Sequence, residues 1–296
     1  MTAPSADAPP ARRPVVVRTL AELAEARATL PGPVGVVPTM GALHEGHAAL
    51  MRFARAESAA VITTVFVNPL QFGPDEDFDR YPRTLDADLE ICAAEGVEVV
   101  FAPSATEMYP RRAPLVRIDP GPLGERLEGE SRPGHFSGML TVVAKLLNLT
   151  RADRAYFGEK DYQQLVLIRQ MVADLDLPVQ VLGVDIVRDA DGLALSSRNR
   201  YLSPEQRRAA AAIPRAVTAG QTAAQRGGTA DQVRDAVLDV LASEPMLELD
   251  RLDLVDARSL HDLSALAAGA PGRLLLAVFA GSTRLIDNCD IHLRKG

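Results

Sequence analysis

The sequence has only two cysteines, Cys92 and Cys289, and they form no C-x-x-C pair. A disulfide framework and a structural zinc site are therefore not expected, and this cysteine usage fits a reducing compartment. No uninterrupted apolar run approaches the roughly 18 residues of a membrane helix, and the best window, residues 61–72, contains Asn68 and Gln71. The N-terminal segment lacks the apolar region of a secretory signal. These absences predict a soluble protein of the cytoplasm.

The chain also has no excess of basic residues. It carries 32 Lys and Arg against 39 Asp and Glu, which gives a formal net charge of −7 over 296 residues. This balance disfavours a protein that binds nucleic acid through a broad basic surface, although it allows a local basic pocket. The hydrophobic fraction of 47% is ordinary for a globular protein. At roughly 150 residues per domain, the length suggests two domains or one large domain.

Up to about residue 187, short apolar runs alternate with longer amphipathic stretches. The apolar runs are rich in β-branched residues, which is typical of strands buried on both faces. We expect strands at residues 14–19, 34–39, 59–67, 97–103, 153–158 and 179–187. We expect helices at residues 19–30, 46–58, 84–96, 139–150 and 162–176, the first opened by a capping box of Thr19 and Glu22. The alternation predicts a doubly wound, Rossmann-like α/β domain with a parallel sheet over residues 14–187.

The remainder of the chain has a different pattern. Ser203 followed by Pro204 predicts the start of an alanine-rich helix that runs to about Gln225, where Gly227 and Gly228 interrupt it. Another helix is expected at residues 230–243, and strands are expected at 252–256, 273–280 and 283–293. Residues 188–296 are therefore predicted to form a smaller α+β domain. The first 13 residues, rich in Pro, Ala and Ser, are predicted to be a flexible tail.

The segment VPTMGALHEGHAALM, residues 37–51, carries the first candidate site. After a strand and a turn at Gly41, it brings His44 and His47 to the start of a predicted helix. A helix N-terminus suits a phosphate, and two imidazoles there can donate hydrogen bonds to phosphate oxygens. Taken alone, the pair could equally be surface histidines, core histidines or half of a metal site. The position of His44, His47 and His135 in short glycine-containing polar loops favours a functional role.

Three further segments carry polar residues at the ends of predicted elements. Asn68 and Gln71 follow a strand, and they place two neutral polar groups beside the presumed pocket. Lys160 lies between a strand end and a helix start, where a lysine would face phosphates, and Gln164 follows one turn into that helix. Residues 196–198, Ser-Ser-Arg, offer hydroxyls and a guanidinium near the domain boundary. Each segment alone could be an ordinary turn, a solvated helix cap or a polar loop.

The pattern T-M-G-x-L-H-x-G-H resembles the signature of the H-x-G-H nucleotidyltransferase superfamily, which includes the class I aminoacyl-tRNA synthetases. With the other segments in this order and spacing, residues 34 to about 205 resemble the pantothenate synthetase (pantoate–β-alanine ligase) family. The resemblance implies an ATP-dependent ligase that condenses (R)-pantoate with β-alanine, giving pantothenate, AMP and pyrophosphate through a pantoyl adenylate. It also implies a homodimer whose substrates are small molecules. Together with the charge balance and the missing apolar span, this predicts no nucleic-acid or membrane partner.

The resemblance also implies roles for individual residues. His47 would be the acid that donates towards the departing pyrophosphate, assisted by His44 and Lys160. Gln71 and Gln164 would bind pantoate, with Asn68 in support. The implied ATP-binding residues are Met40, Gly41, Ala42, Leu43, His44, Glu45, Gly46, His47, Gly158, Glu159, Lys160, Asp161, Val187, Leu195, Ser196, Ser197 and Arg198. Relatives often have methionine where this chain has Leu195, and leucine preserves the apolar packing.

Magnesium is expected to enter on the phosphates of ATP, as Mg²⁺ usually does, and no protein ligand set for a metal is predicted. Asp86 and Asp88 are candidates for outer ligands, although their interpretation as acids in the first turn of a helix is favoured. The sequence contains no G-x-x-x-x-G-K-[ST] motif, so a fused P-loop kinase is excluded.

Rival functions remain open at the level of sequence. Another nucleotidyltransferase that acts on a phosphorylated alcohol would need basic groups where Gln71 and Gln164 are neutral. A class I tRNA synthetase would need an anticodon-binding domain and a basic face. A catalytically silent nucleotide sensor would be expected to lack the histidine pair or Lys160, and this chain has all three residues.

Overall fold

The computed structural model describes residues 13–74, 76–263 and 271–293. The chain divides into two compact units. The first comprises residues 1–120, 132–157 and 168–184, and the second comprises residues 121–131, 158–167 and 185–296. The sequence predicts a single boundary, at residue 187, whereas in the structure residues 121–131 and 158–167 also make most of their contacts in the second unit. Most of the expected N-terminal tail, residues 1–12, lies outside the described residues.

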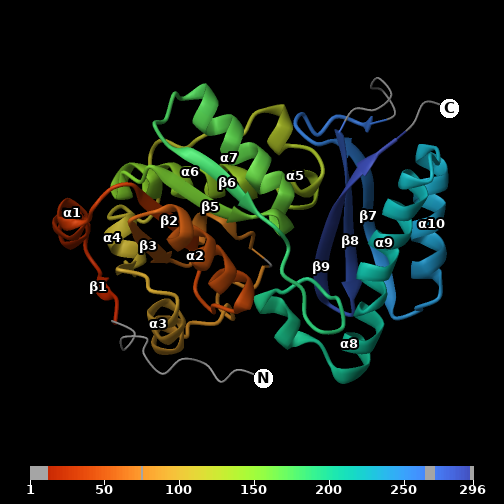
Figure 1. Ribbon diagram of the computed structural model, residues 1–296, viewed down its shortest axis with the longest axis horizontal. Helices are drawn as coiled ribbons and strands as arrows, with labels where there is room; N and C mark the ends of the chain where they lie inside the picture. Colours follow the sequence, from red (N-terminus) through yellow and green to blue (C-terminus); the bar gives the residue numbers. More distant parts are fainter. Residues whose placement is uncertain (1–12, 75, 264–270, 294–296) are drawn as a thin grey trace, which may run out of the picture. The chain divides into compact units, whose positions relative to one another are not determined.

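The first unit is built on a parallel sheet, which confirms the predicted α/β fold (Figure 1). Its strands are β1 (Val15–Val17), β2 (Val34–Thr39), β3 (Ala60–Val65), β4 (Val99–Phe101), β5 (Arg154–Gly158) and β6 (Gln180–Val184), in the order β1-β4-β3-β2-β5-β6. β2 pairs in parallel with β3 on one side and with β5 on the other. β2 and β3 are almost wholly buried, as expected of β-branched runs covered on both faces.

Helices cover both faces of this sheet (Figure 1). They are α1 (Leu20–Thr29), α2 (Glu45–Glu57), α3 (Leu85–Ala94), α4 (Ala105–Met108) and α6 (His135–Thr150), with the short 3-10 helix η1 (Pro69–Gln71). The predicted capping box of Thr19 and Glu22 opens α1. α2 packs with α3, and α1 packs with α6. The last helix, α7 (Tyr162–Asp174), begins in the second unit and ends in the first.

The order of the strands changes direction at β2. From β2 the chain adds β3 and β4 on one side of the sheet, and it then returns to add β5 and β6 on the other side. In open parallel sheets, ligands bind outside the carboxyl ends of the strands at such a reversal. This reversal lies between β2 and β5, so a ligand site is expected at the carboxyl end of β2, and the segment that follows β3 lies at the same edge of the sheet.

The second unit contains the antiparallel sheet β7 (Leu247–Asp256), β8 (Pro271–Ala280) and β9 (Thr283–His292). Its helices are α5 (Glu128–Ser131), α8 (Pro204–Ala210), α9 (Ala212–Gln225) and α10 (Ala230–Ala242), with the 3-10 helices η2 (Pro122–Gly124), η3 (Glu159–Asp161) and η4 (Ser197–Tyr201). The side chains of β7 and β8 alternate between two cores. Leu254 and Leu274 pack with α9 and α10, whereas Val255 packs in a second cluster with Tyr162 and Leu260.

The inner segment 121–131 is tied to the second unit by ion pairs. Arg284 on β9 donates to both oxygens of Glu128, at 2.6 and 2.7 Å. Arg251 on β7 donates to Glu130 at 2.8 Å and to the carbonyl of Leu127 at 3.1 Å. Bidentate arginine–carboxylate pairs fix orientation as well as distance. These contacts explain why a segment so early in the chain belongs to the second unit.

Several predicted elements are corrected by the structure. The alanine-rich helix is interrupted at Ala211 between α8 and α9. α6 begins at His135 and not at residue 139, so His135 is the first residue of a helix and does not lie in a loop. β7 begins at Leu247, before the expected 252, because its first half alternates polar and apolar residues and is not an apolar run. α4 and α5 were not predicted, since four residues are too few for a periodic signal.

Both thiols are held protonated by the fold. Cys92 on α3 is completely buried, and burial, followed by the negative charge of Asp88, raises the pKa of its thiol to about 12. Burial also raises the pKa of the Cys289 thiol on β9 to about 12. An unfolded cysteine ionises near pH 8.5. Because the folded-state pKa is raised, the stability that these thiols contribute is complete below that pH and is lost as the pH rises towards 12.

We expect the free energy of unfolding to fall between pH 8 and pH 10, since the unfolded thiols release protons that the folded ones retain. For one thiol the loss at pH 10 is about 2 kcal/mol. Urea unfolding of the parent and of Cys92→Ala at both pH values tests this. The variant should be less stable at pH 8, and the difference between the two proteins should shrink by about that amount at pH 10. A difference that is independent of pH would contradict the protonated state of Cys92.

Candidate active site

The loop after β2 has an unusual backbone that is held by one carboxylate. Gly41 and Ala42 both have left-handed conformations, with φ of 81° and 50°. Asp88 on α3, which is 1% exposed, accepts hydrogen bonds from the backbone N–H groups of Ala42 at 3.1 Å and Leu43 at 2.8 Å. A Cβ atom at residue 41 would lie 2.9 Å from Asp88 Oδ2, so only glycine fits there. The carboxylate thereby stabilises a conformation that costs free energy at Ala42.

Two histidines cap the helix that follows this loop. His44 is the N-cap of α2, and its Nδ1 accepts from the N–H of Gly46 at 3.1 Å. In return, Nδ1 of His47 accepts from the N–H of His44 at 3.3 Å, and the two rings lie 4.1 Å apart between centroids. A backbone N–H can only donate, so each Nδ1 must be unprotonated. In the neutral rings the proton therefore lies on Nε2.

This arrangement gives the start of α2 a defined chemistry. Both neutral imidazoles carry a proton on Nε2, and the start of the helix adds partial positive charge, although the N–H groups of Gly46, His47 and Ala48 already donate to His44. Such a set of donors suits an anion with several oxygens, such as a phosphate. The structure thus brings together His44 and His47, which the sequence analysis selected, at the expected end of the sheet.

Asn68 and Gln71 are buried at the end of β3, in and beside η1. Nδ2 of Asn68 donates to Oε1 of Gln71 and to the carbonyl of Gly138, both at 3.1 Å. Tyr109 donates its hydroxyl to Oδ1 of Asn68 at 2.9 Å. Nε2 of Gln71 lies 3.3 Å from Sδ of Met40, which joins this group to the loop after β2. The predicted residues Met40, Asn68 and Gln71 therefore belong to one polar cluster.

The backbone of Gln71 is held by His135, one of the three histidines noted in the sequence, and His135 is held in turn by Arg132, which was not selected. Nδ1 of His135 lies 2.8 Å from the Gln71 carbonyl, and Nε2 lies 3.0 Å from Arg132. Because a carbonyl only accepts and a guanidinium only donates, His135 carries its proton on Nδ1. Arg132 in turn forms a bidentate pair with Glu76, at 2.6 and 2.7 Å. The contact of Arg132 with His135 has a local signal in the sequence, because the two residues are three positions apart. No local signal marks the contact of Arg132 with Glu76.

Lys160 and its neighbours lie in the second unit, after β5. Its chain segment is fixed by Asn288, whose Nδ2 donates to the carbonyls of Glu159 and Lys160 at 3.1 and 2.8 Å. The Glu159 carboxylate pairs with Arg273, which also lies 4.1 Å from the centre of the Tyr162 ring. The Lys160 side chain is 19% exposed, and its ammonium lies 3.8 Å from Asp161. The side chain of Glu159, one of the predicted ATP-binding residues, is therefore paired with Arg273 of the same unit.

Two neighbouring glutamines on α7 differ in their surroundings. Gln163 is 3% exposed and makes hydrogen bonds to Glu128, Leu123 and Arg126, so its amide fixes the segment 121–131. Gln164 is half-buried, and its side chain makes no hydrogen bond to another described residue. The predicted substrate residue is thus the glutamine that retains its hydrogen-bonding capacity.

The segment 187–199 is shaped mainly by its own backbone. The N–H of Leu195 donates to the carbonyl of Val187 at 3.0 Å, which closes a turn around Gly192. Ser196 caps η4 by accepting from the N–H of Arg198 at 3.3 Å. Asn199 donates to the carbonyl of Ala194 at 3.0 Å. Ser196, Ser197 and Arg198 therefore lie on one short, half-buried turn of the second unit.

The acidic residues considered for magnesium have other surroundings. Asp86 is exposed on α3, and the carboxylate of Asp88 accepts from Ala42, Leu43 and the hydroxyl of Thr84. Among the described residues, no group of three or more His, Cys, Asp or Glu side chains could hold a metal ion. The interpretation of Asp88 as a structural acid in the first turn of its helix agrees with these contacts.

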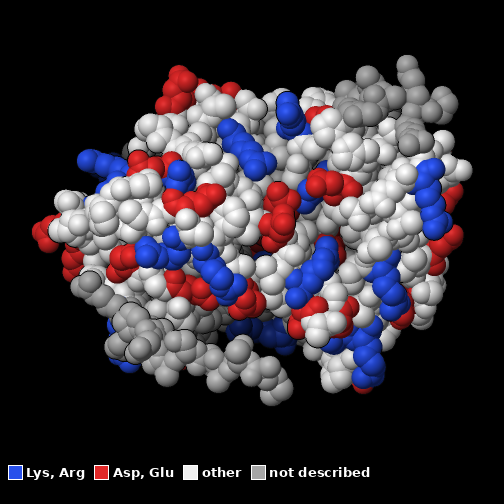
Figure 2. All heavy atoms as spheres, in the orientation of Figure 1, with Lys and Arg blue, Asp and Glu red and all other residues white. Residues whose placement is uncertain are grey.

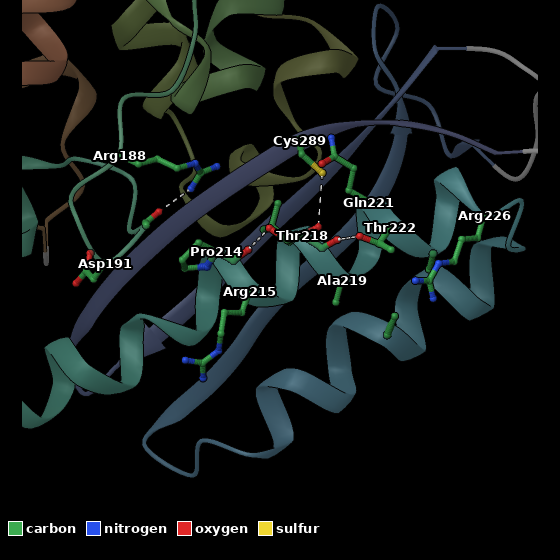
Figure 3. Close-up of a pocket in the computed structure, with 14 residues that line it drawn as sticks. Arg188, Asp191, Pro214, Arg215, Thr218, Ala219, Gln221, Thr222, Arg226 and Cys289 are labelled. Carbon is green, nitrogen blue, oxygen red and sulfur yellow. Dashed lines mark hydrogen bonds between the residues drawn. The ribbon is translucent and has the colours of Figure 1, made fainter.

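A hollow of about 920 Å³ lies on the second unit between α9, α10 and the turn at residues 188–192 (Figure 3). Several of its polar groups are used within the protein. Thr218 and Thr222 donate to carbonyls one turn earlier, and Cys289 donates to the carbonyl of Val217. Arg188 makes a bidentate pair with Asp287, at 2.6 and 2.9 Å. This hollow contains none of the predicted site residues and no acid–base pair suited to catalysis.

One face of the protein is mixed in charge (Figure 2). On the face drawn in Figure 2, basic and acidic side chains are interspersed and form no broad basic area. Among the described residues, ion pairs such as that of Arg52 with Glu45 and Glu95 also place opposite charges side by side. No helix among the residues that the structure describes is long and apolar enough to cross a membrane.

Known proteins resemble the chain over nearly its whole length. The family model for pantoate-beta-alanine ligase matches residues 15–290. The pantothenate synthetase of Salinispora arenicola is 57% identical over 279 residues, which cover 94% of this chain and 98% of that protein. The pantothenate synthetase of Acidothermus cellulolyticus is 54% identical over 282 residues, which cover 95% of this chain and 92% of that protein.

Solved structures give the same result. The crystal structure of pantothenate synthetase from Thermus thermophilus has a TM-score of 0.88 and 49% identity, and the match covers 94% of this chain and 99% of that one. The pantoate-beta-alanine ligase from Francisella tularensis, complexed with beta-gamma ATP and beta-alanine, has a TM-score of 0.77 and 35% identity. That match covers 93% of this chain and 97% of the other.

The backbones of α6 and η1 approach each other closely at Gly138, and a substitution there tests this contact. A Cβ atom at Gly138 would lie 2.0 Å from the carbonyl oxygen of Leu70, so Gly138→Ala must push the two backbones apart. Although alanine favours a helix by about 1 kcal/mol, overpacking of this kind costs about 1–3 kcal/mol or more. We expect a net loss of stability in urea unfolding. The control is Asn148→Ala, at an exposed position of the same helix, which should be neutral or slightly stabilising. Equal stability of the two variants would contradict the close contact.

Proposed function

Because the chain belongs to the pantoate-beta-alanine ligase family, we propose that it condenses (R)-pantoate with β-alanine at the expense of ATP. In the first step a pantoate carboxylate oxygen attacks the α-phosphorus of ATP, and the bond to pyrophosphate breaks. In the second step the amine of β-alanine attacks the acyl carbon, the bond to AMP breaks, and the nitrogen loses a proton. The observation that carries the proposal is the His44–His47 pair at the start of α2.

The histidine pair acts on the first step. Negative charge builds on the departing pyrophosphate, and donors already aimed at that charge lower the barrier without further reorganisation. Nε2–H of His44 and His47 are such donors, because their Nδ1 atoms are held by the backbone. We assign His47 as the acid, in the sense that its Nε2–H donates towards pyrophosphate through a hydrogen bond that strengthens as negative charge builds there, with His44 as its partner. The loop of Met40 to Leu43, together with residues 45 and 46, lines the nucleotide.

Neutral amides bind the hydroxy acid, and basic groups bind the phosphates. Gln71 and Gln164 hydrogen-bond the hydroxyl and carboxylate of pantoate, which suits a substrate without a phosphate of its own. Lys160, with Gly158, Glu159 and Asp161 around it, neutralises phosphate charge. Ser196, Ser197 and Arg198 add two hydroxyls and a guanidinium, while Val187 and Leu195 contact the adenosine. Support for these roles comes from the family's motifs and from the local structure of each segment.

Magnesium is proposed to arrive with ATP and to be held chiefly by the phosphates. When bound there, it would offset phosphate charge. The described residues provide no carboxylate cluster for it, and Asp88 already accepts hydrogen bonds from the protein, so no residue is assigned as its ligand. We further propose that the enzyme is a homodimer, as the family resemblance implies, and that it acts in the cytoplasm, which its cysteine usage fits. Sedimentation in solution tests the dimer.

The order of the two steps is tested by isotope exchange. If the adenylate forms before the amine binds, pantoate alone should support exchange of labelled pyrophosphate into ATP. The adenylate must be shielded from water to survive, so exchange should also exceed AMP release under these conditions. Exchange that appears only after β-alanine is added would rule out the two-step order. Exchange supported by a phosphorylated alcohol in place of pantoate would favour another nucleotidyltransferase.

The role of His47 is tested by a substitution that removes the donor Nε2–H but retains an acceptor in place of Nδ1. His47→Asn keeps an acceptor near the position of Nδ1 for the His44 N–H, but it removes the Nε2–H donor. We expect adenylate formation to slow by about a hundredfold to ten-thousandfold in His47→Ala and in His47→Asn, as for loss of an acid catalyst. Thermal melts should show that the asparagine variant is folded. Single-turnover rates within a few-fold of the parent would exclude the assignment.

Gln164→Ala provides the contrasting variant. Losing one neutral hydrogen bond to substrate should weaken pantoate binding by about 0.5–1.5 kcal/mol, with a smaller effect on the rate of adenylate formation. Single-turnover kinetics over a range of pantoate concentrations separate the two quantities. An unchanged affinity would remove Gln164 from the substrate site while leaving the histidine assignment intact.

A further inference from the structure

The amide of Asn68 has an orientation that the backbone determines. An asparagine oxygen and nitrogen are assigned from their hydrogen-bond partners. Nδ2 of Asn68 faces the carbonyl of Gly138 at 3.1 Å, and Oδ1 faces the N–H of Leu70 at 3.4 Å. A carbonyl can only accept and an N–H can only donate. The amide of Asn68 therefore cannot be turned over without setting two pairs of like groups against each other.

This orientation is transmitted to Gln71. Nδ2 of Asn68 lies 3.1 Å from the side-chain amide of Gln71, and the atom that meets an N–H donor must be the oxygen, Oε1. Nε2 of Gln71 then points the other way, towards Sδ of Met40 at 3.3 Å. Met40 begins the loop that leads to the histidine pair. Gln71 thus presents a donor, and not an acceptor, on the side of that loop.

Asn68 itself has no hydrogen-bonding capacity to spare. Its two N–H groups are used by Gly138 and Gln71, and its oxygen accepts from Leu70 and from the hydroxyl of Tyr109 at 2.9 Å. The residue is 1% exposed. A side chain with this inventory acts on a ligand through its neighbours and not by direct contact.

The geometry points to Asn68 and Tyr109 as positioning residues, which hold Gln71 so that its Nε2–H donates to an acceptor oxygen of the hydroxy acid. This inference rests on the proposed function, in which Gln71 binds pantoate. It assigns Asn68 a role different from direct support of the substrate. It also adds Tyr109, which lies outside the sequence motifs.

Tyr109 is suited to act as a fixed donor in this chain. It is 4% exposed, and its ring packs 6.0 Å from that of Phe66. Burial raises the pKa of its phenol to about 12, so the hydroxyl keeps its proton throughout the neutral range. The short bond to Oδ1 of Asn68 supplements the longer one from Leu70. His135 independently holds the backbone carbonyl of Gln71. The Gln71 residue is therefore fixed both at its backbone and at its side-chain amide.

A double-mutant cycle on pantoate affinity tests the inference, with binding measured by calorimetry. Tyr109→Phe removes one hydrogen bond to Asn68 and should weaken pantoate binding by about threefold to tenfold. Asn68→Asp replaces the donor Nδ2 by oxygen, turns the Gln71 amide over, and should weaken binding by about tenfold to a hundredfold. In a Gln71→Ala background both losses should shrink below about twofold, because neither residue would retain a route to the substrate.

The matched control is Tyr156→Phe. Tyr156 is completely buried in the same unit, and its hydroxyl lies 3.2 Å from that of Ser58, with no contact to Asn68 or Gln71. It should leave the affinity for pantoate unchanged in both backgrounds. Equal losses in Tyr109→Phe and Tyr156→Phe would mean that Tyr109 has only a structural role, and would overturn the inference.

Additive losses in the Gln71→Ala background would also overturn it, since they would show direct contact of Asn68 with substrate. If Asn68→Asp fails to fold, the cycle of Tyr109→Phe with Gln71→Ala decides the question alone. The side-chain NH₂ resonance of Gln71, observed by NMR without ligand, gives a readout independent of activity. It should shift in Tyr109→Phe and not in Tyr156→Phe; an unchanged resonance would contradict the relay. A shift without any binding of pantoate by the parent would instead place the failure in the proposed function.

Discussion

The arrangement of the first unit's site depends on the hold of Asp88 on the loop after β2. Two consecutive residues, Gly41 and Ala42, have left-handed backbone conformations, and the carboxylate receives the N–H groups that this geometry turns inward. Without that acceptor, buried N–H groups would lose their partners at a cost of roughly 1–3 kcal/mol each. The loop decides where His44 begins the next helix. A single acid on a neighbouring helix thus sets the position of the histidine pair.

Around this loop, the polar side chains of the candidate site are fixed by hydrogen bonds within the protein. Each ring of the histidine pair caps α2 through Nδ1, which places the proton of the neutral ring on Nε2. Gln71 uses its oxygen within the protein and directs its nitrogen towards Met40. Because each group is fixed at one end, little conformational freedom is left to lose when a ligand binds. The site is organised by the same bonds that terminate the elements of the fold.

Sequence patterns predicted the parts of this structure that have short-range signals. The β-branched runs indicated the strands, and the Thr19 capping box indicated the start of α1. The histidine motif, placed between a strand and a helix, located the candidate site. What escaped prediction depends on long-range contacts: Tyr109 reaches Asn68 across 41 residues, and Glu76 reaches Arg132 across 56. No periodicity or local motif encodes such pairs, and only the folded chain brings them together.

The ion pair of Glu128 with Arg284 has a consequence for the order in which the chain can fold during synthesis. The two residues are separated by 156 positions, yet both belong to the second unit. The segment 121–131 therefore leaves the ribosome long before β7 and β9, which hold it through Arg251 and Arg284. A truncated chain ending near residue 187 would contain this acidic segment without its arginines. Truncation after the last strand of the parallel sheet would therefore not yield an isolated first unit, because the shortened chain would still contain residues 121–131 of the second unit.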